Sequence, residues 1–437
     1  MKHLFPIVSL CGAIVLAGCG SSSSSSSGSD DPSGGTPTNV APTIAGDANT
    51  TVSVGQPYSF IPTAGDADGD VLTFSIQNKP AWADFNASNG ALTGTPTAYG
   101  ATADINISVS DGEASASLPL FTITVYERVK ATGQMKSYDE TGTEVTDGSL
   151  KDDGYYRAGT ALDYERDDTL EIVTDNVTGM IWQDDATVET SVSLINEETW
   201  SEVYPVATAC DRTNTLAVGG YSDWRVPTIA EQLTFLDMGT GDSFVKVVEH
   251  TFTYSLTQSI LNSSSDTDMN RKVWAFTHGS SAYIKNADST YNKVQCVRGN
   301  ALDTTTTLAR DNETAIVTDT KTGLMWQDDA NITDSGTMDW AAAIDHCEAM
   351  TLGGYDDWRL PNFMEMVSIT DFDAETIKTG FENAGGTEYF WTSTSNGGVP
   401  SKAWYYRFNP DSTYFANAYA YMKTQGSFKA MCVRTIE

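Results

Sequence analysis

The sequence predicts a multidomain chain in which an all-β sandwich precedes two α+β domains, each closed by one disulfide. Short runs of alternating apolar and polar residues fill residues 42–127, and such runs are typical of antiparallel strands. The remainder of the 437-residue chain carries one series of motifs written twice. Each series has its own pair of cysteines, which indicates two domains of one kind.

The N-terminal residues have the pattern of a bacterial lipoprotein signal. Met1–His3 is a short basic start, and Leu4–Val15 is largely apolar. This apolar run is too short to cross a membrane and is typical of a secretory signal. Leu16–Cys19 (Leu-Ala-Gly-Cys) resembles the lipobox of bacterial lipoproteins. The resemblance implies that residues 1–18 are removed and that Cys19 becomes the N-terminus, acylated with chains such as palmitate. The alternative is a plain secretory signal with a chance cysteine.

A flexible tether follows the predicted anchor. Residues 19–41 contain the serine run Ser21–Ser27 and several glycines, a composition that buries no core. Gly20, rather than aspartate, follows the cysteine, and in lipoproteins of this kind that implies the outer membrane. We therefore expect an outer-membrane lipoprotein of the cell envelope, periplasmic or surface-exposed. It is expected to attach to the membrane through the lipid on Cys19.

The acidic composition excludes one class of partner. The chain has 58 acidic and 25 basic residues, for a formal net charge of -33. No cluster of lysine or arginine interrupts this charge beyond the signal, so the field of the protein repels nucleic acid and other polyanions. We expect no nucleic-acid partner. Solubility of an exposed surface explains the charge, and cation binding is the alternative.

The predicted sandwich carries an acidic turn. Asp66–Asp70 (DADGD), together with Gly90–Pro96 and Ser110–Gly112, resembles the cadherin-like and Ig-like domains of bacterial surface proteins. Calcium takes about six to eight oxygen ligands, and carboxylates at alternate positions can supply several of them. The candidate calcium ligands are Asp66, Asp68, Asp70 and Asp111. The alternative is a polar turn whose aspartates bond their own backbone.

The repeated series consists of three strings in one order. They are Thr178–Ala186 and Thr322–Ala330 (TGxxWQDDA), Gly219–Pro227 and Gly353–Pro361 (GGYxDWRxP), and Cys296–Arg298 and Cys432–Arg434 (CVR). Four cysteines allow three pairings, but a bridge inherited by both copies selects Cys210–Cys296 and Cys347–Cys432. Such bridges persist in an oxidising compartment. The alternative is free or metal-binding thiols.

Helices are predicted at two places in the series. Trp340, Ile344 and Cys347 fall on one face of a helix in the second copy. Thr228–Glu231 and Asn362–Glu365 each place a capping residue three positions before a glutamate. This spacing is the signature of a capping box at a helix N-terminus.

These strings resemble the domain at the C-terminus of the collagen-like adhesin of Legionella, and the resemblance covers two copies. It implies an α+β fold related to C-type lectins and to formylglycine-generating enzymes, and it implies attachment or ligand binding more than catalysis. The adhesin of that family binds sulfated polysaccharide, a ligand that this acidic chain does not favour. The predicted divisions are a signal peptide (1–18), a tether (19–41), an Ig/cadherin-like sandwich (42–127), a C-type-lectin-like repeat with an N-terminal lead-in (128–308) and a second such repeat (309–437).

Two sets of residues in the repeats stand out, one as a candidate structural cluster and one as candidate ligand contacts. Tryptophans and Asp-Trp-Arg triplets recur in both copies, so we assign them to a structural cluster, with a ligand clamp as the alternative. They are Trp182, Asp223, Trp224, Arg225, Trp326, Asp357, Trp358 and Arg359. The C-terminal aromatic run differs between the copies, and aromatic faces stack on the apolar faces of sugars. The candidate ligand contacts are Trp404, Tyr406, Tyr414 and Tyr419; one buried strand face is the alternative.

The predicted function is a surface-anchored, non-catalytic binding or adhesion module, with glycans as one ligand class. The three histidines outside the signal occupy unmatched positions in the two copies, and the chain has no hydrolase, metalloprotease or nucleotide-binding motif. We therefore expect no enzyme, and calcium is the one cofactor considered. The first alternative is an envelope structural or assembly protein that binds a partner protein. The second is an enzyme related to the formylglycine-generating fold.

Overall fold

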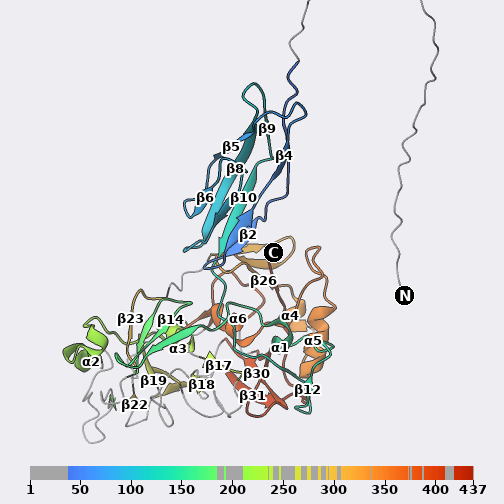
Figure 1. Cartoon of the computed structure of the whole chain (residues 1–437). Helices are drawn as coiled ribbons and strands as arrows, with labels where there is room; N and C mark the ends of the chain where they lie inside the picture. Colours follow the sequence, from blue (N-terminus) through green and yellow to red (C-terminus); the bar gives the residue numbers. More distant parts are fainter. Residues whose placement is uncertain are drawn as a thin grey trace, which may run out of the picture.

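The computed structural model describes residues 38–184, 210–234, 236–239, 295–302, 307–334, 336–372, 374, 376–385, 388–408 and 418–436. It also describes the strand backbones at 191–192, 246–247, 261–266, 273–276, 284–286 and 292–293. Cys19 and Tyr414 lie outside the described residues, as do the predicted signal and most of the tether. Figure 1 shows the sandwich standing on the two repeats, which lie side by side. Within the described part, no helix is both long and apolar enough to span a membrane.

The predicted sandwich is present as a set of short strands. They are β1 (Thr43–Ala45), β2 (Thr51–Ser53), β3 (Tyr58–Phe60), β4 (Thr63–Gly65), β5 (Thr73–Gln77), β6 (Ala83–Phe85), β7 (Leu92–Gly94), β8 (Gly100–Ser110), β9 (Ser115–Ser117) and β10 (Phe121–Tyr126). One sheet has the order β2-β10-β8-β5 with β9 on β8, another has the order β3-β7-β6, and β1 pairs with β4. Ile105, Ile107 and Val109 of β8 are buried, because alternate side chains of a strand point to one face.

Both repeats contain the same four-stranded antiparallel sheet. In repeat 1 its order is β13 (Tyr164–Asp167), β14 (Ile172–Asp175), β15 (Ile181–Gln183) and β23 (Val297–Arg298). In repeat 2 its order is β24 (Leu308–Asp311), β25 (Ile316–Asp319), β26 (Leu324–Gln327) and β32 (Val433–Thr435). The registers also agree, since Trp182 pairs with Val297 and Trp326 pairs with Val433. Each sheet therefore contains an antiparallel hairpin around the Thr-Gly turn.

Two helices of the repeats begin at the predicted capping residues, Thr228 and Asn362. The helices of the repeats are α2 (Asp211–Thr215), α3 (Ile229–Leu233), α4 (Asn331–Asp334), α5 (Trp340–Glu348) and α6 (Phe363–Ser368), with a 3-10 turn η2 (Val218–Gly220). Thr228 and Asn362 form complete capping boxes at α3 and α6. Each box satisfies backbone donors that the first turn of a helix leaves unpaired. In α5, the predicted face of Trp340, Ile344 and Cys347 is buried.

Each repeat also has a second sheet and a small hairpin. Repeat 1 has β16 (Ser191–Val192), β22 (Asn292–Lys293), β19 (Leu261–Asp266), β20 (Val273–Phe276) and β21 (Ile284–Asn286) in that spatial order, and β17 (Leu236–Asp237) with β18 (Lys246–Val247). Repeat 2 has β29 (Phe390–Ser395), β30 (Lys402–Tyr406) and β31 (Ala418–Met422), and β27 (Thr370–Asp371) with β28 (Thr376–Ile377). Two buried clusters flank the sheet of repeat 2: Phe363 packs with Trp404 and Tyr406 on one side, and Trp391 packs with Ala403 on the other.

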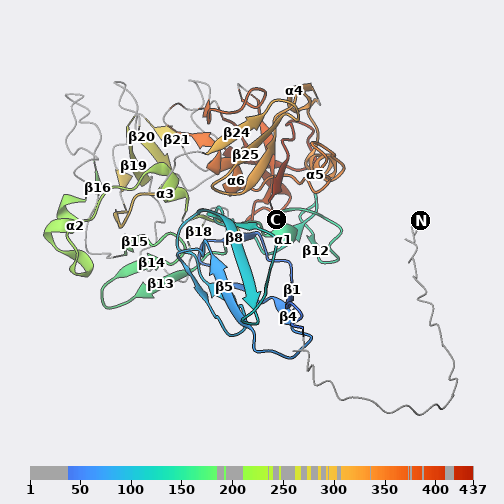
Figure 2. The same ribbon diagram turned by 90° about the horizontal axis from the view of Figure 1, so that it is seen from above.

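The lead-in segment, residues 128–161, connects the sandwich to both repeats. It contains β11 (Ser137–Tyr138), β12 (Glu144–Val145) and α1 (Asp153–Tyr156), and Figures 1 and 2 both place α1 and β12 beside α5 of repeat 2. We expected this segment to pack with repeat 1, which follows it in the chain. In the structure Lys130 bonds to Asp175 of repeat 1, whereas the Gln134 side chain accepts a bond from the Ser395 amide of repeat 2 at 2.7 Å. The segment therefore contacts both repeats, and its contact with repeat 2 could not be predicted from sequence order.

Candidate functional site

The aspartate of each Asp-Trp-Arg triplet pairs with the arginine of the Cys-Val-Arg string. Asp223 accepts a bond from Arg298 Nε at 2.7 Å, and Asp357 accepts one from Arg434 Nε at 2.6 Å. The Arg434 guanidinium lowers the pKa of the Asp357 carboxyl by hydrogen bonding to it. In both repeats the arginine also stacks on the tyrosine of the second string, such as Tyr355. These side chains thus join two motifs of the same repeat.

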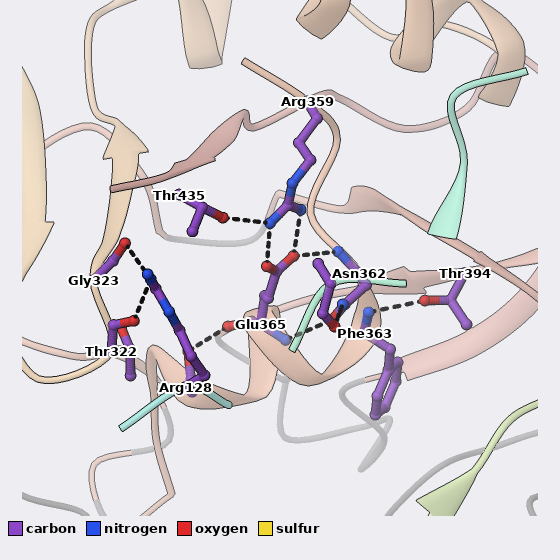
Figure 3. A network of polar contacts seen from close by, with 11 residues as sticks. Arg128, Thr322, Gly323, Arg359, Asn362, Phe363, Glu365, Thr394 and Thr435 are labelled. Carbon is purple, nitrogen blue, oxygen red and sulfur yellow. Dashed lines mark hydrogen bonds and ion pairs between the residues drawn. The ribbon is translucent and has the colours of Figure 1, made fainter. Parts of the chain in front are cut away.

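The arginine of each triplet is held by the capping-box glutamate. Arg359 donates through Nη1 and Nη2 to the two carboxylate oxygens of Glu365, as Figure 3 shows. Glu365 also accepts from the Asn362 amide at 2.8 Å, and Thr435 accepts from Arg359 at 3.3 Å. In repeat 1, Arg225 forms the equivalent two-bond pair with the α3 glutamate. Such planar pairing fixes both geometry and charge, so this arginine holds the helix cap.

The tryptophans lie inside the repeats. Trp182 and Trp326 are completely buried, and Trp224 and Trp358 are nearly so. The indole N–H of Trp224 donates to the Val218 carbonyl at 3.1 Å, and Trp358 donates to the equivalent carbonyl of repeat 2. Fully buried rings of this size supply core packing. This geometry favours the structural assignment of the shared strings over a ligand clamp.

A second buried ion pair was missed by the sequence analysis. Arg166 Nε donates to Asp184 at 2.7 Å and Arg310 Nε donates to Asp328 at 2.6 Å, and both aspartates have fully buried side chains. The carboxylate of Asp328 additionally accepts the backbone amides of residues 382–384. The available signal was the WQDD string itself, because a charged residue kept at the same place in both copies is expected to have a fixed partner.

Both predicted disulfides are present. Cys210 bonds Cys296 with a Cα–Cα distance of 5.9 Å, and Cys347 bonds Cys432 with a distance of 5.5 Å. In repeat 2 the bridge joins α5 to the residue before β32. Each bridge closes a long loop, which restricts the unfolded chain.

The acidic turn of the sandwich brings together three of the four candidate calcium ligands. Carboxylate oxygens of Asp66, Asp68 and Asp70 lie within 4.8 Å of one another, and Asp66 Oδ2 is buried without a hydrogen-bond partner. These oxygens fit part of a calcium shell. Asp66 Oδ1, however, accepts the backbone amides of Asp68 and Asp70, which is the bonding of a polar turn.

The fourth predicted calcium ligand, Asp111, does not lie with the other three. The carboxylate of Asp111 accepts the amides of Glu113 and Ala114 at 2.7 and 2.6 Å and the side-chain amide of Asn39 at 3.0 Å. These hydrogen bonds lower the pKa of the Asp111 carboxyl, with the bond from Ala114 contributing most. Asp111 therefore organises its own turn and does not join the group of three carboxylates.

Two predicted ligand contacts, Trp404 and Tyr406, are buried and cannot reach a ligand at the surface. Trp404 and Tyr406 of β30 are 2% and 0% exposed, and both rings pack on Phe363. The Tyr406 hydroxyl also lies 2.6 Å from Thr370 Oγ1. Side chains of a strand alternate between faces, so the residue between them, Tyr405, points to the opposite side. Of the other two predicted ligand contacts, Tyr419 lies beside Tyr405, with ring centroids 6.0 Å apart, and Tyr414 lies outside the described residues.

Tyr405 and its neighbours form a cluster that we call the tyrosine surface: Tyr389, Tyr405, Tyr419 and Tyr421, with Phe428 packed against Tyr389, Tyr405 and Tyr421. Ring centroids of Tyr405 lie 5.5, 6.0 and 6.3 Å from those of the other three tyrosines and 4.2 Å from Phe428. Tyr389 and Tyr421 are 37% and 38% exposed. Partial burial raises the pKa of the Tyr405 hydroxyl, which keeps it neutral. The surface thus offers aromatic faces and phenolic hydroxyls together.

The tyrosine surface is repeated only in part in the sequence of repeat 1. Counted back from the second cysteine of each repeat, Tyr421 corresponds to Lys285 and Phe428 corresponds to Asn292, whereas Tyr419 corresponds to Tyr283. An arginine borders the surface, since the Arg407 guanidinium lies 5.0 Å from the Tyr389 ring centroid. The copies therefore differ at Tyr421 and Phe428 of this cluster, whereas the ion pairs described above occur in both.

Comparison with known proteins identifies both parts of the chain. The model described as "Lcl C-terminal domain" matches residues 171–298 and 315–434, and the model described as "Putative Ig domain" matches residues 41–126. No curated protein matches the sequence.

Several solved structures resemble parts of the chain. A "putative alpha-galactosidase" from Bacteroides fragilis is 12% identical, covering 24% of this chain and 22% of its own, with a TM-score of 0.18. Human protocadherin-24 is 18% identical, covering 33% of this chain and 77% of its own, with a TM-score of 0.17. The SrpA adhesin of Streptococcus sanguinis is 10% identical, covering 34% of this chain and 89% of its own, with a TM-score of 0.19. Likenesses at these scores carry no argument about function. Because the two matched segments of the first model together make up more than half of the sequence, the chain belongs to the Lcl C-terminal domain family.

Proposed function

We propose that this chain is a non-catalytic adhesion lipoprotein of the cell envelope that binds carbohydrate through the tyrosine surface of repeat 2. The family assignment supports a binding or adhesion role at the surface. The observation that carries the ligand class is the exposed pair Tyr389 and Tyr421 beside Tyr405, because aromatic faces are amphipathic platforms with a polar hydroxyl. Lipid anchoring at Cys19 and the tether supply the attachment of this module to a membrane.

The net charge narrows the ligand class. A chain with a formal charge of -33 repels sulfated or carboxylated polysaccharide at a distance. Neutral sugars face no such repulsion, and stacking on tyrosine needs no charge. We therefore assign neutral glycans to the surface in preference to sulfated ones. Calcium at Asp66, Asp68 and Asp70 is a separate part of the proposal and concerns the sandwich, not the tyrosine surface.

A glycan array probed with the full chain, and with Tyr421→Ala, tests this function. Tyr99→Ala is the matched control, because Tyr99 of the sandwich is also 38% exposed. Loss of one stacking ring is expected to weaken binding by about tenfold, equivalent to ~1.4 kcal/mol, while the control binds normally. Unchanged binding by Tyr421→Ala contradicts the assignment of the surface.

The same array distinguishes carbohydrate binding from the main alternative function. An envelope structural or assembly protein would give no glycan signal and would instead capture one envelope protein in a pull-down. Repeating the array with a calcium chelator shows whether the acidic turn contributes, since Tyr421 and Asp66 lie in different domains.

A further inference from the structure

Asp153 of the lead-in segment is a buried carboxyl at the contact with repeat 2. It is 2% exposed and belongs to α1, which packs on β29. The hydroxyls of Thr132 and Thr394 lie 2.5 and 2.8 Å from Asp153 Oδ2. Thr132 belongs to the lead-in and Thr394 to repeat 2, so this carboxyl joins the two across their contact.

The two carboxyl oxygens of Asp153 differ in their hydrogen bonding. Both hydroxyls lie on Oδ2, whereas Oδ1 is buried and has no hydrogen-bond partner. An ionised carboxylate in that position leaves charge on an unpaired, desolvated oxygen, which is costly. A neutral carboxyl avoids that cost and can donate its proton to a threonine hydroxyl, which accepts as well as donates.

The charges that face Asp153 do not offset this cost. Asp152, its neighbour in the chain, and Glu365 of α6 both oppose its ionisation. Arg359 attracts Asp153 but has its two-bond partner in Glu365. Lys423, which follows β31, donates to lead-in carbonyls and to a serine of β29 and has Asp152 as its principal charge partner. Burial, with these neighbours, raises the pKa of the Asp153 carboxyl to about 7.

We propose that the lead-in segment is a pH-sensitive clasp on repeat 2, closed while Asp153 holds its proton and loosened when Asp153 ionises. The clasp is more than one carboxyl, since the Asn362 side chain also donates to the Ala158 carbonyl at 3.1 Å and Tyr156 donates to Glu348 at 2.7 Å. Because the proton is held more tightly in the closed state than in the open one, Asp153 stabilises the closed state fully in acid. This contribution is lost as the pH rises toward and through neutrality.

Lys423 acts in the opposite direction and must be separated from Asp153. Burial lowers the pKa of the Lys423 ammonium to about 7, so its contribution to the closed state grows as the pH rises from about neutral toward its ordinary range. A pH profile of the unaltered chain therefore contains opposing effects, to which Asp152 adds, because burial also raises the pKa of its carboxyl. Comparison with Asp153→Asn isolates one of them, because the amide has the same shape, carries no charge and leaves Lys423 unchanged.

Hydrogen exchange of peptides from residues 132–158 in the full chain measures opening of the clasp. Expressed as protection factors, these data are free of the intrinsic pH dependence of exchange. Between about pH 5 and about pH 8, the ratio of protection in the unaltered chain to that in Asp153→Asn is expected to fall by at least ~10-fold. Peptides of the sandwich serve as the control and should give a constant ratio.

A constant ratio for residues 132–158 overturns the proposal. If Asp153→Asn does not fold, ¹³C titration of the aspartate carboxyls in the unaltered chain decides the matter. The clasp requires an aspartate carboxyl that titrates near neutral pH in the same range in which protection of the segment changes. Titration of every aspartate in the ordinary acidic range overturns it.

Discussion

Arg128, directly after the sandwich, donates from Nη2 to the carbonyl of Ile436 at 2.8 Å, which joins residues 308 positions apart in the sequence. Its Nη1 also donates to the carbonyls of Thr322 and Gly323 at 2.9 and 3.0 Å, as Figure 3 shows for these two residues. The sandwich therefore docks on the Thr-Gly turn of repeat 2, although repeat 1 follows it in the chain.

This junction can be tested with a pair of equivalent glycines. Gly323 and Gly179 have nearly the same backbone angle, φ 68° and 72°, so alanine strains both turns alike. A Cβ on Gly323 would meet Arg128 at 2.5 Å and the Tyr126 ring at 2.8 Å, whereas a Cβ on Gly179 meets nothing within 4 Å. We expect Gly323→Ala to reduce the free energy of unfolding by about 1–3 kcal/mol more than Gly179→Ala does.

Denaturant unfolding followed by circular dichroism compares the two glycine variants. Small-angle scattering of the folded proteins adds a second measurement, because displacement of the sandwich lengthens the molecule. Equal losses of stability and identical scattering in both variants would show that the Arg128 contact does not hold the junction.

Replacing the arginine by alanine is expected to reduce stability unequally in the two arginine–glutamate pairs. The side chain of Arg359 is 6% exposed and that of Arg225 is 31% exposed, while their glutamate partners are both buried. Removing one partner of a buried pair leaves an uncompensated charge, at a cost of about 3–5 kcal/mol, and water reduces this cost at a partly exposed pair.

Thermal or chemical unfolding of Arg359→Ala and Arg225→Ala measures that difference. We expect Arg359→Ala to be the more destabilised variant. Glu365→Gln in the Arg359→Ala background is the control, because removing the second charge should recover part of the loss. Equal losses of stability in the two arginine variants would contradict this expectation.

The lipid anchor is a prediction from the sequence alone. Cys19→Ala removes the thiol that acylation requires, and each buried acyl methylene contributes about 0.8 kcal/mol to membrane binding. We expect Cys19→Ala to move the protein from the membrane fraction to the periplasm or the medium. Cys11→Ala, which changes a cysteine inside the apolar run, should leave membrane fractionation as it is. Fractionation unchanged by Cys19→Ala refutes lipidation at this residue.

Several features could be predicted because they depend on local sequence or on the duplication. The capping boxes at Thr228 and Asn362 follow from a three-residue spacing, which is local physics. The pairing of Cys347 with Cys432 follows from comparison of two copies. The face of β30 could not be chosen, because alternation shows that Trp404 and Tyr405 point to opposite sides but does not show which side is covered.

The sequence by itself determined the number of domains, the disulfide pairing and the strings that build each repeat, because motif order, spacing and repetition are properties of the chain alone. Tertiary structure decided the rest: that Tyr405 and Trp404 pack against different buried clusters, that Asp111 bonds its own turn, that the sandwich rests on repeat 2 and that the lead-in segment contacts both repeats. These outcomes depend on which surfaces distant segments cover. Burial and partner choice are set by contacts between residues that lie far apart in sequence, such as Arg128 and Ile436.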